Sequence, residues 1–430
     1  MSTYPISSGA RRVHLVAWHG TRVEWVSVAA FVTIAFHLLF DAVTRGRPAA
    51  VTALELLGGL VLAPGLFVVF LHAGRLWRIV IAGVAGLAAL GLGIEAHAAG
   101  AFMAGRSASD VTGIAMALAG LVLVGVALQL SLTGLRRWLQ ALLILAVVVA
   151  ISQLVLVPAI NVSVVTHAPR EAVPPASTLA LRGARDVNFS APDGVRLRGW
   201  YVPSRHGAAV ILLHGSHGDR TSTEDYLRFL SRAGYGVLAF DARGHGQSGG
   251  HTNALGWQAD RDVAGAVAFL RRQQGIDPNR IGMLGLSMGA EVALRAAANG
   301  TPLRAVVADG AGAATAGDNR LVSHGWSAPL YYAVSWLTMR QAELLSTYDE
   351  PAPLKSIVGR IEAPTLLIAT NWNDEITFNR KFRALTGSNA RLWYVPDSGH
   401  TRAFREHPAR YTARVENFLA AALLDGSRAG

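Results

Sequence analysis

Hydrophobic residues are distributed unevenly along the chain. Residues 1–165 consist of long apolar runs separated by short segments that carry arginine, whereas the rest of the chain mixes apolar and polar residues. A helix that crosses a membrane needs about 20 mostly apolar residues. Five runs in series reach this length, which is more than the core of one soluble domain supplies. The pattern predicts an all-α transmembrane domain of about five helices, near residues 25–43, 51–72, 77–99, 111–132 and 138–160.

The ends of these runs suggest how the helices lie in a membrane. Trp25, Trp77 and Trp138 each begin a run, where an indole suits the lipid–water interface. If the N-terminus is cytoplasmic, the inner segments carry more arginine than the outer segments, as the positive-inside rule requires. We therefore expect a multi-pass protein of the cell membrane, with the C-terminal domain on the extracytoplasmic side. The first run is long and lacks a small-residue cleavage site, so it is interpreted as a retained span.

Beyond residue 165, short apolar segments alternate with amphipathic ones. Prolines at 169, 174 and 175 predict an extended Pro-rich linker over 166–180, followed by a second domain over 181–430. Asp193-Gly194 is typical of a turn between two strands. The alternation predicts an α/β domain with a mostly parallel sheet and helices on both faces. A segment over 310–360 interrupts the alternation and is expected to form a small cap. The predicted strands lie in 186–202 (two strands), 209–213, 235–240, 280–286, 303–308, 365–369 and 391–395, and the helices at 223–233, 258–273, 288–298 and 411–424.

Charge and cysteine content exclude several classes of function. The net charge of +11 comes almost entirely from arginine, which is scattered rather than concentrated in one basic stripe. No nucleic-acid-binding motif accompanies it, so no nucleic-acid partner is expected, whereas anionic membrane lipid would attract the arginines beside the apolar runs. The chain contains no cysteine, which excludes thiolate nucleophiles, disulfides and cysteine-ligated metals.

A serine in a glycine-flanked turn is the candidate nucleophile. Gly285-Leu286-Ser287-Met288-Gly289 follows a predicted strand and opens a predicted helix. A tight turn there holds the serine clear of the sheet edge, and glycines on both sides avoid collision with neighbouring backbone. The strand–turn–helix context, more than the pentapeptide, identifies Ser287 as the nucleophile.

A serine needs a base, and the base needs an acid that fixes its tautomer. His400 follows the last predicted strand and is the candidate base. Asp374 follows the strand at 365–369 and is the candidate acid, with Asp309 as the alternative. Glu375, next to Asp374, is expected to point elsewhere. The order Ser, Asp, His along the chain agrees with this arrangement.

An oxyanion forms when serine attacks a carbonyl, and backbone N–H groups stabilise it. The N–H of Met288, directly after the nucleophile, is one candidate. The N–H of Ser216, in the turn after the strand at 209–213, is the other. His214 and His217 in the same turn are interpreted as packing residues.

These features together resemble the α/β-hydrolase superfamily. The resemblance rests on the Ser287, Asp374 and His400 positions, on His214-Gly215, and on the segment from Asp241 to Ser248, and it covers about 250 residues. Serine aminopeptidase-like and monoacylglycerol lipase-like hydrolases are the most similar groups. The resemblance implies cleavage of esters, amides or peptides without a cofactor or metal. The segment 370–377 departs from the family, because it lacks the glycine and proline that many relatives carry near the acid.

The predicted function is therefore that of a membrane-anchored serine hydrolase. An ester of a lipid or small acyl group is the preferred substrate, because a membrane tether keeps the site near such molecules. A peptidase, an amidase or an acyltransferase with the same triad is the alternative among enzymes. A non-catalytic hydrolase-like sensor or partner domain is the alternative of another class. The substrate and the oligomeric state stay open.

Overall fold

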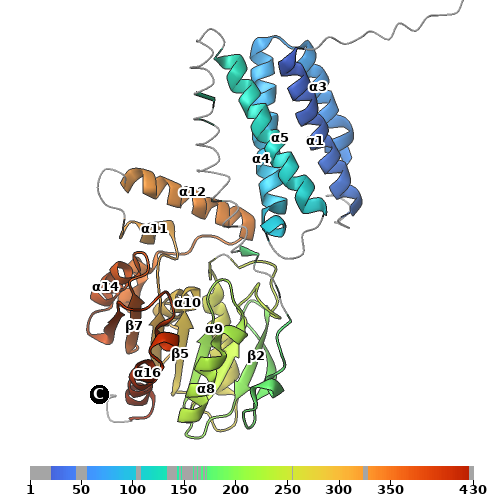
Figure 1. The fold of residues 1–430 in the computed structure, drawn as a ribbon. Coiled ribbons are helices and arrows are strands. Elements are labelled where there is room, and N and C mark those ends of the chain that lie inside the picture. Colours follow the sequence, from blue (N-terminus) through green and yellow to red (C-terminus); the bar gives the residue numbers. More distant parts are fainter. Residues whose placement is uncertain are drawn as a thin grey trace, which may run out of the picture. The chain divides into compact units, whose positions relative to one another are not determined.

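The computed structural model of the chain describes residues 21–44, 56–102, 108–132, 172–253, 255–322 and 328–425, with a few single positions between 143 and 170. The chain divides into two compact units (Figure 1). One comprises Met1–His97 and Ser107–Val148, and the other comprises Ala98–Arg106 and Val149–Gly430.

The first unit is helical. It contains α1 (Arg22–Thr44), a π-helical turn (Gly58–Leu62) that continues into α3 (Ala63–His72), α4 (Arg75–Phe102) and α5 (Ala108–Ser131). Helices α4 and α5 approach closely where their glycines meet, since a Cβ atom added to Gly86 would lie 2.7 Å from the carbonyl oxygen of Gly120. Small residues allow such contact between apolar helices.

Two helices among the described residues are long and apolar enough to cross a membrane, which is fewer than the five predicted. They cover Arg22–Ala42 and Thr112–Ser131. The predicted span 51–72 is a shorter apolar helix, Gly58–His72. The span 77–99 lies within α4, of which the side chains of 91–102 are not described. The span 138–160 lies almost wholly outside the described residues.

The second unit is built on an eight-stranded sheet with the order β1-β2-β4-β3-β5-β6-β7-β8. The first two strands pair antiparallel, β2 also pairs antiparallel with β4, and the sheet is parallel from β4 to β8. Each predicted strand agrees with the structure to within two residues. The strands are β1 (Arg185–Ser190), β2 (Arg196–Val202), β3 (Ala209–Leu213), β4 (Gly236–Phe240), β5 (Ile281–Leu286), β6 (Ala305–Asp309), β7 (Thr365–Thr370) and β8 (Ala390–Val395).

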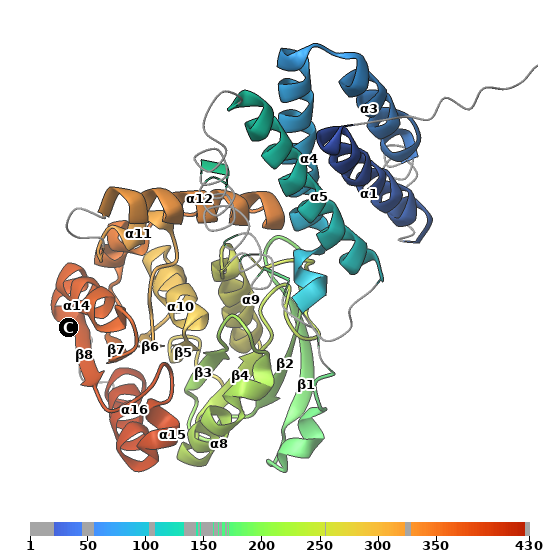
Figure 2. The ribbon, with the colours of Figure 1, turned by 45° about the horizontal axis from the view of Figure 1, so that its top comes forward.

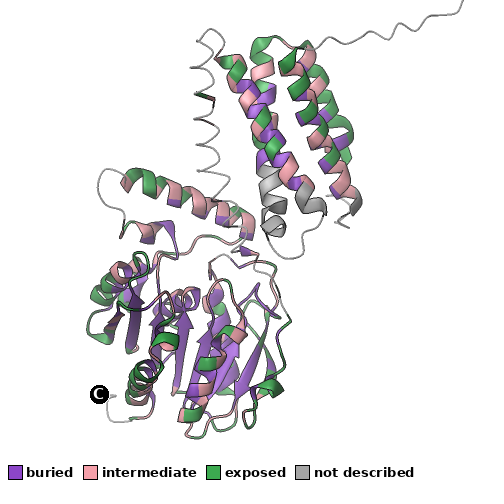
Figure 3. Cartoon of the chain, viewed as in Figure 1, coloured by how far each residue is buried: buried purple, intermediate pink, exposed green. Residues whose placement is uncertain are grey.

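Helices cover both faces of this sheet, as the alternation predicted. On one face α9 (Ala259–Arg271), α10 (Met288–Ala298) and α14 (Glu375–Thr386) pack their apolar sides into one core. On the other face α8 (Glu224–Ala233) and α16 (Pro408–Leu423) form a second core. The central strands are wholly buried because both of their faces are covered, as the purple strands of Figure 3 show.

The segment between β6 and β7 forms three helices where the cap was predicted. They are α11 (Ala316–Asn319), α12 (Ala328–Ser346) and α13 (Leu354–Ile357). Met339 and Ala342 of α12 pack in one cluster with the buried Trp257. Tyr331 of α12 lines a cavity that also contains Ser287, so α12 lies over the carboxyl edge of the sheet (Figure 2).

The predicted linker over 166–180 is not a free spacer in its second half. A 3-10 turn, Ala176–Leu179, buries both of its end residues in the core shared with α8 and α16. The indole N–H of Trp200 donates to the carbonyl of Pro174 at 3.1 Å. The second half of the predicted linker therefore belongs to the core of the hydrolase domain.

Candidate active site

Ser287 occupies a strained turn between β5 and α10. Its backbone has φ 51° and ψ −117°, a conformation that residues with a Cβ rarely adopt. The flanking glycines permit this turn, because a Cβ atom at Gly285 would lie 2.0 Å from the carbonyl oxygen of Gly289, and one at Gly289 would lie 2.4 Å from that of Leu213. The N–H of Ser287 donates to the carbonyl of Asp309 at 2.8 Å, which ties the turn to β6.

His400 lies against the hydroxyl of Ser287, as predicted. It follows β8, and its Nε2 atom is 2.8 Å from the Oγ atom of Ser287. With the serine hydroxyl as donor, Nε2 is the unprotonated nitrogen and Nδ1 carries the hydrogen. This is the tautomer in which a histidine removes a proton from serine.

Glu375, not Asp374, is the acid that contacts His400. The Nδ1 atom of His400 is 2.7 Å from the Oε2 atom of Glu375, while the other carboxylate oxygen accepts the N–H of Thr370 at 2.6 Å. The carboxylate is almost completely buried, with 3% of the residue exposed. The expectation that Glu375 points elsewhere was wrong, and Asp374 is exposed at the position before α14.

The apolar pattern of α14 explains this difference. The buried residues of the helix fall on one stripe at spacings of three and four: Glu375, Phe378, Asn379, Phe382 and Thr386. Asp374 lies outside this stripe and Glu375 begins it. The sequence therefore contained a signal for the acid, and the choice of Asp374 from its position after the strand at 365–369 did not use it.

Asp309, the alternative acid, contacts Tyr411 instead of His400. Its Oδ2 atom accepts the hydroxyl of Tyr411 at 2.8 Å. The carboxyl is fully buried at the end of β6, and burial raises its pKa to about 7. No hydrogen bond joins it to His400 among the described residues, so the structure does not place it in the row with Ser287.

Two buried histidines, His214 and His245, hold the turn after β3 that contains Ser216, one of the two predicted oxyanion donors. The Nδ1 atom of His214 is 2.7 Å from the carbonyl oxygen of Gly215, and its Nε2 atom accepts the N–H of Ala242 at 3.0 Å. The Nε2 atom of His245 is 2.9 Å from the carbonyl oxygen of Ser216. Burial, followed by the neighbouring His245, lowers the pKa of His214 to about 3, so this ring is neutral and acts as a packing residue.

The backbone of this turn lies next to the nucleophile. A Cβ atom on Gly215 would be 3.3 Å from the Cβ atom of Ser287, and Ser216 lines the same cavity as Ser287. Met288 is the first residue of α10, where a backbone N–H has no acceptor within its own helix. Both predicted donors, Ser216 and Met288, are thus on segments that border the serine.

An exposed tryptophan stacks on the histidine. The ring centroids of Trp372 and His400 are 4.3 Å apart and their planes differ by 29°. Trp372 comes from the turn between β7 and α14, the segment that departs from the expected family pattern. No sequence argument singled it out.

Two cavities meet at the Ser287–His400 pair. The α8–α15 cavity, named for α8 and α15 (Ala403–Glu406), measures about 670 Å³, and the α14 cavity measures about 620 Å³. No group of three or more His, Asp or Glu side chains in the described ranges could hold a metal ion. The α8–α15 cavity is lined by Gly215, Ser216, His217, Gly218, Ser222, Asp225, Tyr226, Leu286, Ser287, His400, Thr401, Arg402, Phe404, Arg405 and Pro408. The α14 cavity is lined by Ser287, Glu291, Gly310, Gly312, Ala313, Asn319, Tyr331, Trp372, Asn373, Asp374, Glu375, Phe378 and His400.

The parallel sheet, the serine turn and the order of the three side chains define a hydrolase of the α/β class. The chain belongs to the alpha/beta hydrolase family, whose model matches residues 210–415. The protein Rv2307c of Mycobacterium tuberculosis (strain H37Rv) is 31% identical over 231 residues, which are 53% of this chain and 75% of the relative. YfhR of Escherichia coli (strain K12) is 27% identical over 251 residues, 56% of this chain and 82% of the relative.

A solved structure gives a further likeness. The esterase Pf2001 of Pyrococcus furiosus aligns with 60% of this chain and 98% of its own, at 27% identity and a TM-score of 0.49.

Proposed function

We propose that this protein is a serine hydrolase that cleaves an ester through an acyl-enzyme. One observation carries the proposal: the Oγ atom of Ser287, the imidazole of His400 and the carboxylate of Glu375 form a continuous hydrogen-bonded row, with distances of 2.8 and 2.7 Å. The row ends in two cavities large enough for a substrate, and membership of the hydrolase family supports it.

The geometry suits the two half-reactions of acyl transfer. His400 removes the proton of Ser287 as the oxygen attacks the carbonyl carbon, and Glu375 stabilises the imidazolium that forms. The N–H groups of Ser216 and Met288 are the proposed donors to the oxyanion. When the tetrahedral intermediate collapses, the imidazolium gives its proton to the leaving oxygen. A water molecule then repeats the sequence on the acyl-enzyme and releases Ser287.

We further propose that the helical unit anchors the enzyme to a membrane as a multi-pass domain, with the hydrolase domain on the extracytoplasmic side. Helices α1 and α5 meet the length and hydropathy of membrane spans. Large apolar side chains are exposed on the first unit, including Val32, Leu60, Trp77 and Val84 at 60–65%. Exposed apolar surface of this kind suits contact with lipid. An anchored site would favour esters of lipids or of small acyl groups.

Labelling with a fluorophosphonate tests the catalytic proposal. The wild-type protein should react, and Ser287→Ala should not. Ser222→Ala is the matched control, because Ser222 is exposed and lines the same cavity, but its hydroxyl donates to the carbonyl of Asp219 at 2.7 Å rather than to a histidine. Failure of the folded wild-type protein to label would favour a non-catalytic domain. Hydrolysis of p-nitrophenyl esters compared with aminoacyl and peptide anilides then separates an esterase from an amidase or peptidase.

The membrane proposal has its own test. The chain contains no cysteine, so a single introduced cysteine gives a clean signal. Ser388→Cys lies on an exposed turn of the hydrolase domain, and Ser7→Cys lies near the N-terminus. In intact cells an impermeant maleimide should label Ser388→Cys and spare Ser7→Cys. Labelling of Ser7→Cys alone would reverse the orientation, and labelling of both or neither would contradict an odd number of spans.

A further inference from the structure

The two cavities at Ser287 carry charges of opposite sign. The α8–α15 cavity is lined by two guanidinium groups, Arg402 and Arg405, and one carboxylate, Asp225. The α14 cavity is lined by the carboxylates of Glu291, Asp374 and Glu375 and by no lysine or arginine. A charged substrate therefore meets different surroundings on the two sides of the reacting serine.

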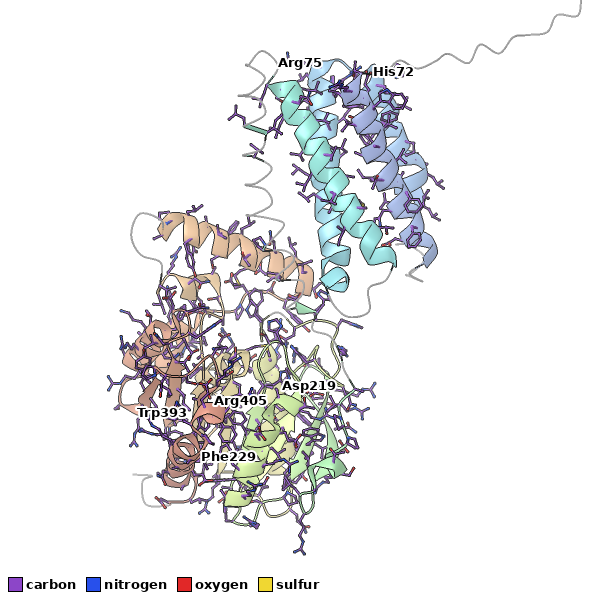
Figure 4. The ribbon with its side chains drawn as sticks, in the orientation of Figure 1. His72, Arg75, Asp219, Phe229, Trp393 and Arg405 are labelled. Atoms are coloured by element: carbon purple, nitrogen blue, oxygen red, sulfur yellow. The ribbon has the colours of Figure 1, made fainter. Side chains whose placement is uncertain are left out.

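The protein compensates the two guanidinium groups only in part: a hydrogen bond from Ser398 and, to a lesser extent, the charge of Arg402 lower the pKa of the exposed Glu406 carboxyl. Arg402 precedes α15 and Arg405 lies within it, three residues later; Figure 4 labels Arg405. Both are exposed, and neither forms an ion pair or donates a side-chain hydrogen bond within the described part of the chain. The nearby carboxylate of Glu406 accepts the N–H of Gly399 at 3.2 Å. Two neighbouring guanidiniums at the mouth of a cavity can hold a carboxylate or a phosphate through charge-assisted hydrogen bonds.

The opposite cavity disfavours an anion. The carboxyl of Glu291 accepts the N–H of Gly312 at 3.1 Å and lines the α14 cavity one helical turn after Ser287. Asp374 adds an exposed carboxylate to the same wall. Burial raises the pKa of Glu291 to about 7, so this carboxyl is only partly ionised at neutral pH, and the repulsion of an anionic substrate group there comes mainly from the exposed Asp374. Charge thus favours placing an anionic group in the α8–α15 cavity.

The α8–α15 cavity also offers an apolar wall. The rings of Tyr226 and Phe404 are in contact, with centroids 4.7 Å apart and planes tilted by 39°, and Leu286 lies beside Ser287. A cavity with an apolar wall and a cationic mouth fits a molecule with a hydrocarbon segment that ends in, or carries, an anion.

We propose that the α8–α15 cavity selects ester substrates that carry an anionic group, a carboxylate or a phosphate, which Arg402 and Arg405 bind. This inference rests on the proposed serine-hydrolase function and names its substrate class. The anion lies on one side of the scissile carbonyl and the uncharged or cationic part of the substrate lies in the α14 cavity. Since the guanidiniums are exposed, the preference weakens as salt rises.

Matched esters test the inference. The p-nitrophenyl monoester of glutaric acid is compared with its methyl ester, which has the same chain without the charge. A second pair, lysophosphatidate and monoacylglycerol with the same acyl chain, separates a phosphate from a carboxylate. The measured quantity is the ratio of kcat/KM for the anionic member to that for the neutral member of each pair, because the ratio cancels effects on the shared chemistry.

The wild-type protein should prefer the anionic member of at least one pair. The double variant Arg402→Gln/Arg405→Gln should lower the anionic-to-neutral ratio of kcat/KM by about tenfold, because it removes two exposed charge contacts of roughly 0.7 kcal/mol each. The single variant Arg405→Gln, farther from His400 in sequence, should lower it by about threefold. Arg383→Gln, an exposed arginine on α14 that lines neither cavity, is the control of equal charge change and should leave the ratio unaltered.

Two results would overturn the inference while leaving the proposed function intact. One is hydrolysis of both pairs with ratios near one in the wild-type protein. The other is an anionic preference that the double variant retains. If no ester is hydrolysed and the fluorophosphonate does not label Ser287, the serine-hydrolase proposal itself is refuted, and the inference falls with it.

Discussion

Replacing Glu375 by glutamine tests which carboxylate supports the histidine. Glu375 uses both of its oxygens: one accepts the N–H of Thr370 at 2.6 Å and the other contacts Nδ1 of His400 at 2.7 Å. In Glu375→Gln the amide oxygen can keep the contact with Thr370. The amide nitrogen then faces His400, where it can only donate. Nδ1 would have to accept, so the hydrogen would move to Nε2, which faces Ser287.

That tautomer cannot remove the proton of the serine. A hydrogen bond to a charged partner contributes about 1.5–3 kcal/mol, or about 10- to 150-fold in rate. The wrong tautomer adds to this loss, and the equivalent change in a known serine protease lowers kcat by about 10⁴-fold. We therefore expect Glu375→Gln to lower kcat by about 10³- to 10⁴-fold. Glu375→Asp keeps the charge but shortens the side chain by one methylene, and a smaller loss of about 10- to 100-fold is expected.

Asp374→Asn is the matched control. Its carboxylate is exposed and caps no backbone N–H of α14, so kcat should change by less than about threefold. The assay is the steady-state hydrolysis of a p-nitrophenyl ester, with circular dichroism to show that each variant folds. A larger loss in Asp374→Asn than in Glu375→Gln would refute the assignment of Glu375 and restore the aspartate that the sequence suggested.

Three further predictions concern residues around this row. Trp372→Ala removes a ring stacked on His400 and with it the cation–π stabilisation of the imidazolium, which is about 0.5–2 kcal/mol. The variant should therefore lower kcat by about 2- to 30-fold with little change in KM. Trp372→Phe keeps an aromatic ring and should retain most activity. Burial raises the pKa of Asp309 from 3.8 to about 7, so its contribution to stability is complete below pH 4 and is lost as the pH rises toward 7. Asp309→Asn should therefore flatten the pH dependence of the unfolding free energy by up to about 4 kcal/mol in urea titrations, and an unchanged slope would contradict the buried neutral carboxyl. Gly289→Ala would place a Cβ atom 2.4 Å from a backbone oxygen, and a loss of more than about 2 kcal/mol is expected in thermal unfolding; a near-normal melting temperature would show that the turn can relax.

The sheet of the hydrolase domain could be predicted because its signals are local. The strands at 209–213 and 281–286 are short and wholly apolar, and the glycine-flanked Ser287 follows directly after the second of them. Since the carboxyl ends of parallel strands share one edge, the order of the elements also placed His400 near the serine. Predicting the strands and the two site residues needs only the period of the apolar residues along the chain and the position of a residue relative to the end of its strand.

The number of membrane spans was harder to predict because a count of apolar residues does not reveal the geometry of a helix. The run 51–72 also contains Glu55 and His72, and its described part includes a π-helical turn, Gly58–Leu62. A π-helical turn changes the rise per residue, so counting apolar residues misjudges the length of the helix. Composition also cannot separate a lipid-facing surface from one that packs against a neighbouring helix.

The segment that departs from the family pattern, residues 370–377, is also where the acid was misassigned, and it contains a residue with left-handed backbone. Asn373 has φ 45°, a left-handed conformation that asparagine tolerates better than most residues. After this turn α14 begins with Glu375, which is buried, while Asp374 directly before it is exposed. The same turn leaves Trp372 over the imidazole. A glutamate, one methylene longer than an aspartate, then reaches Nδ1 of His400 from the first turn of a helix. The position of the acid therefore depends on the preceding turn together with the buried stripe of α14, and only the stripe can be read from the sequence.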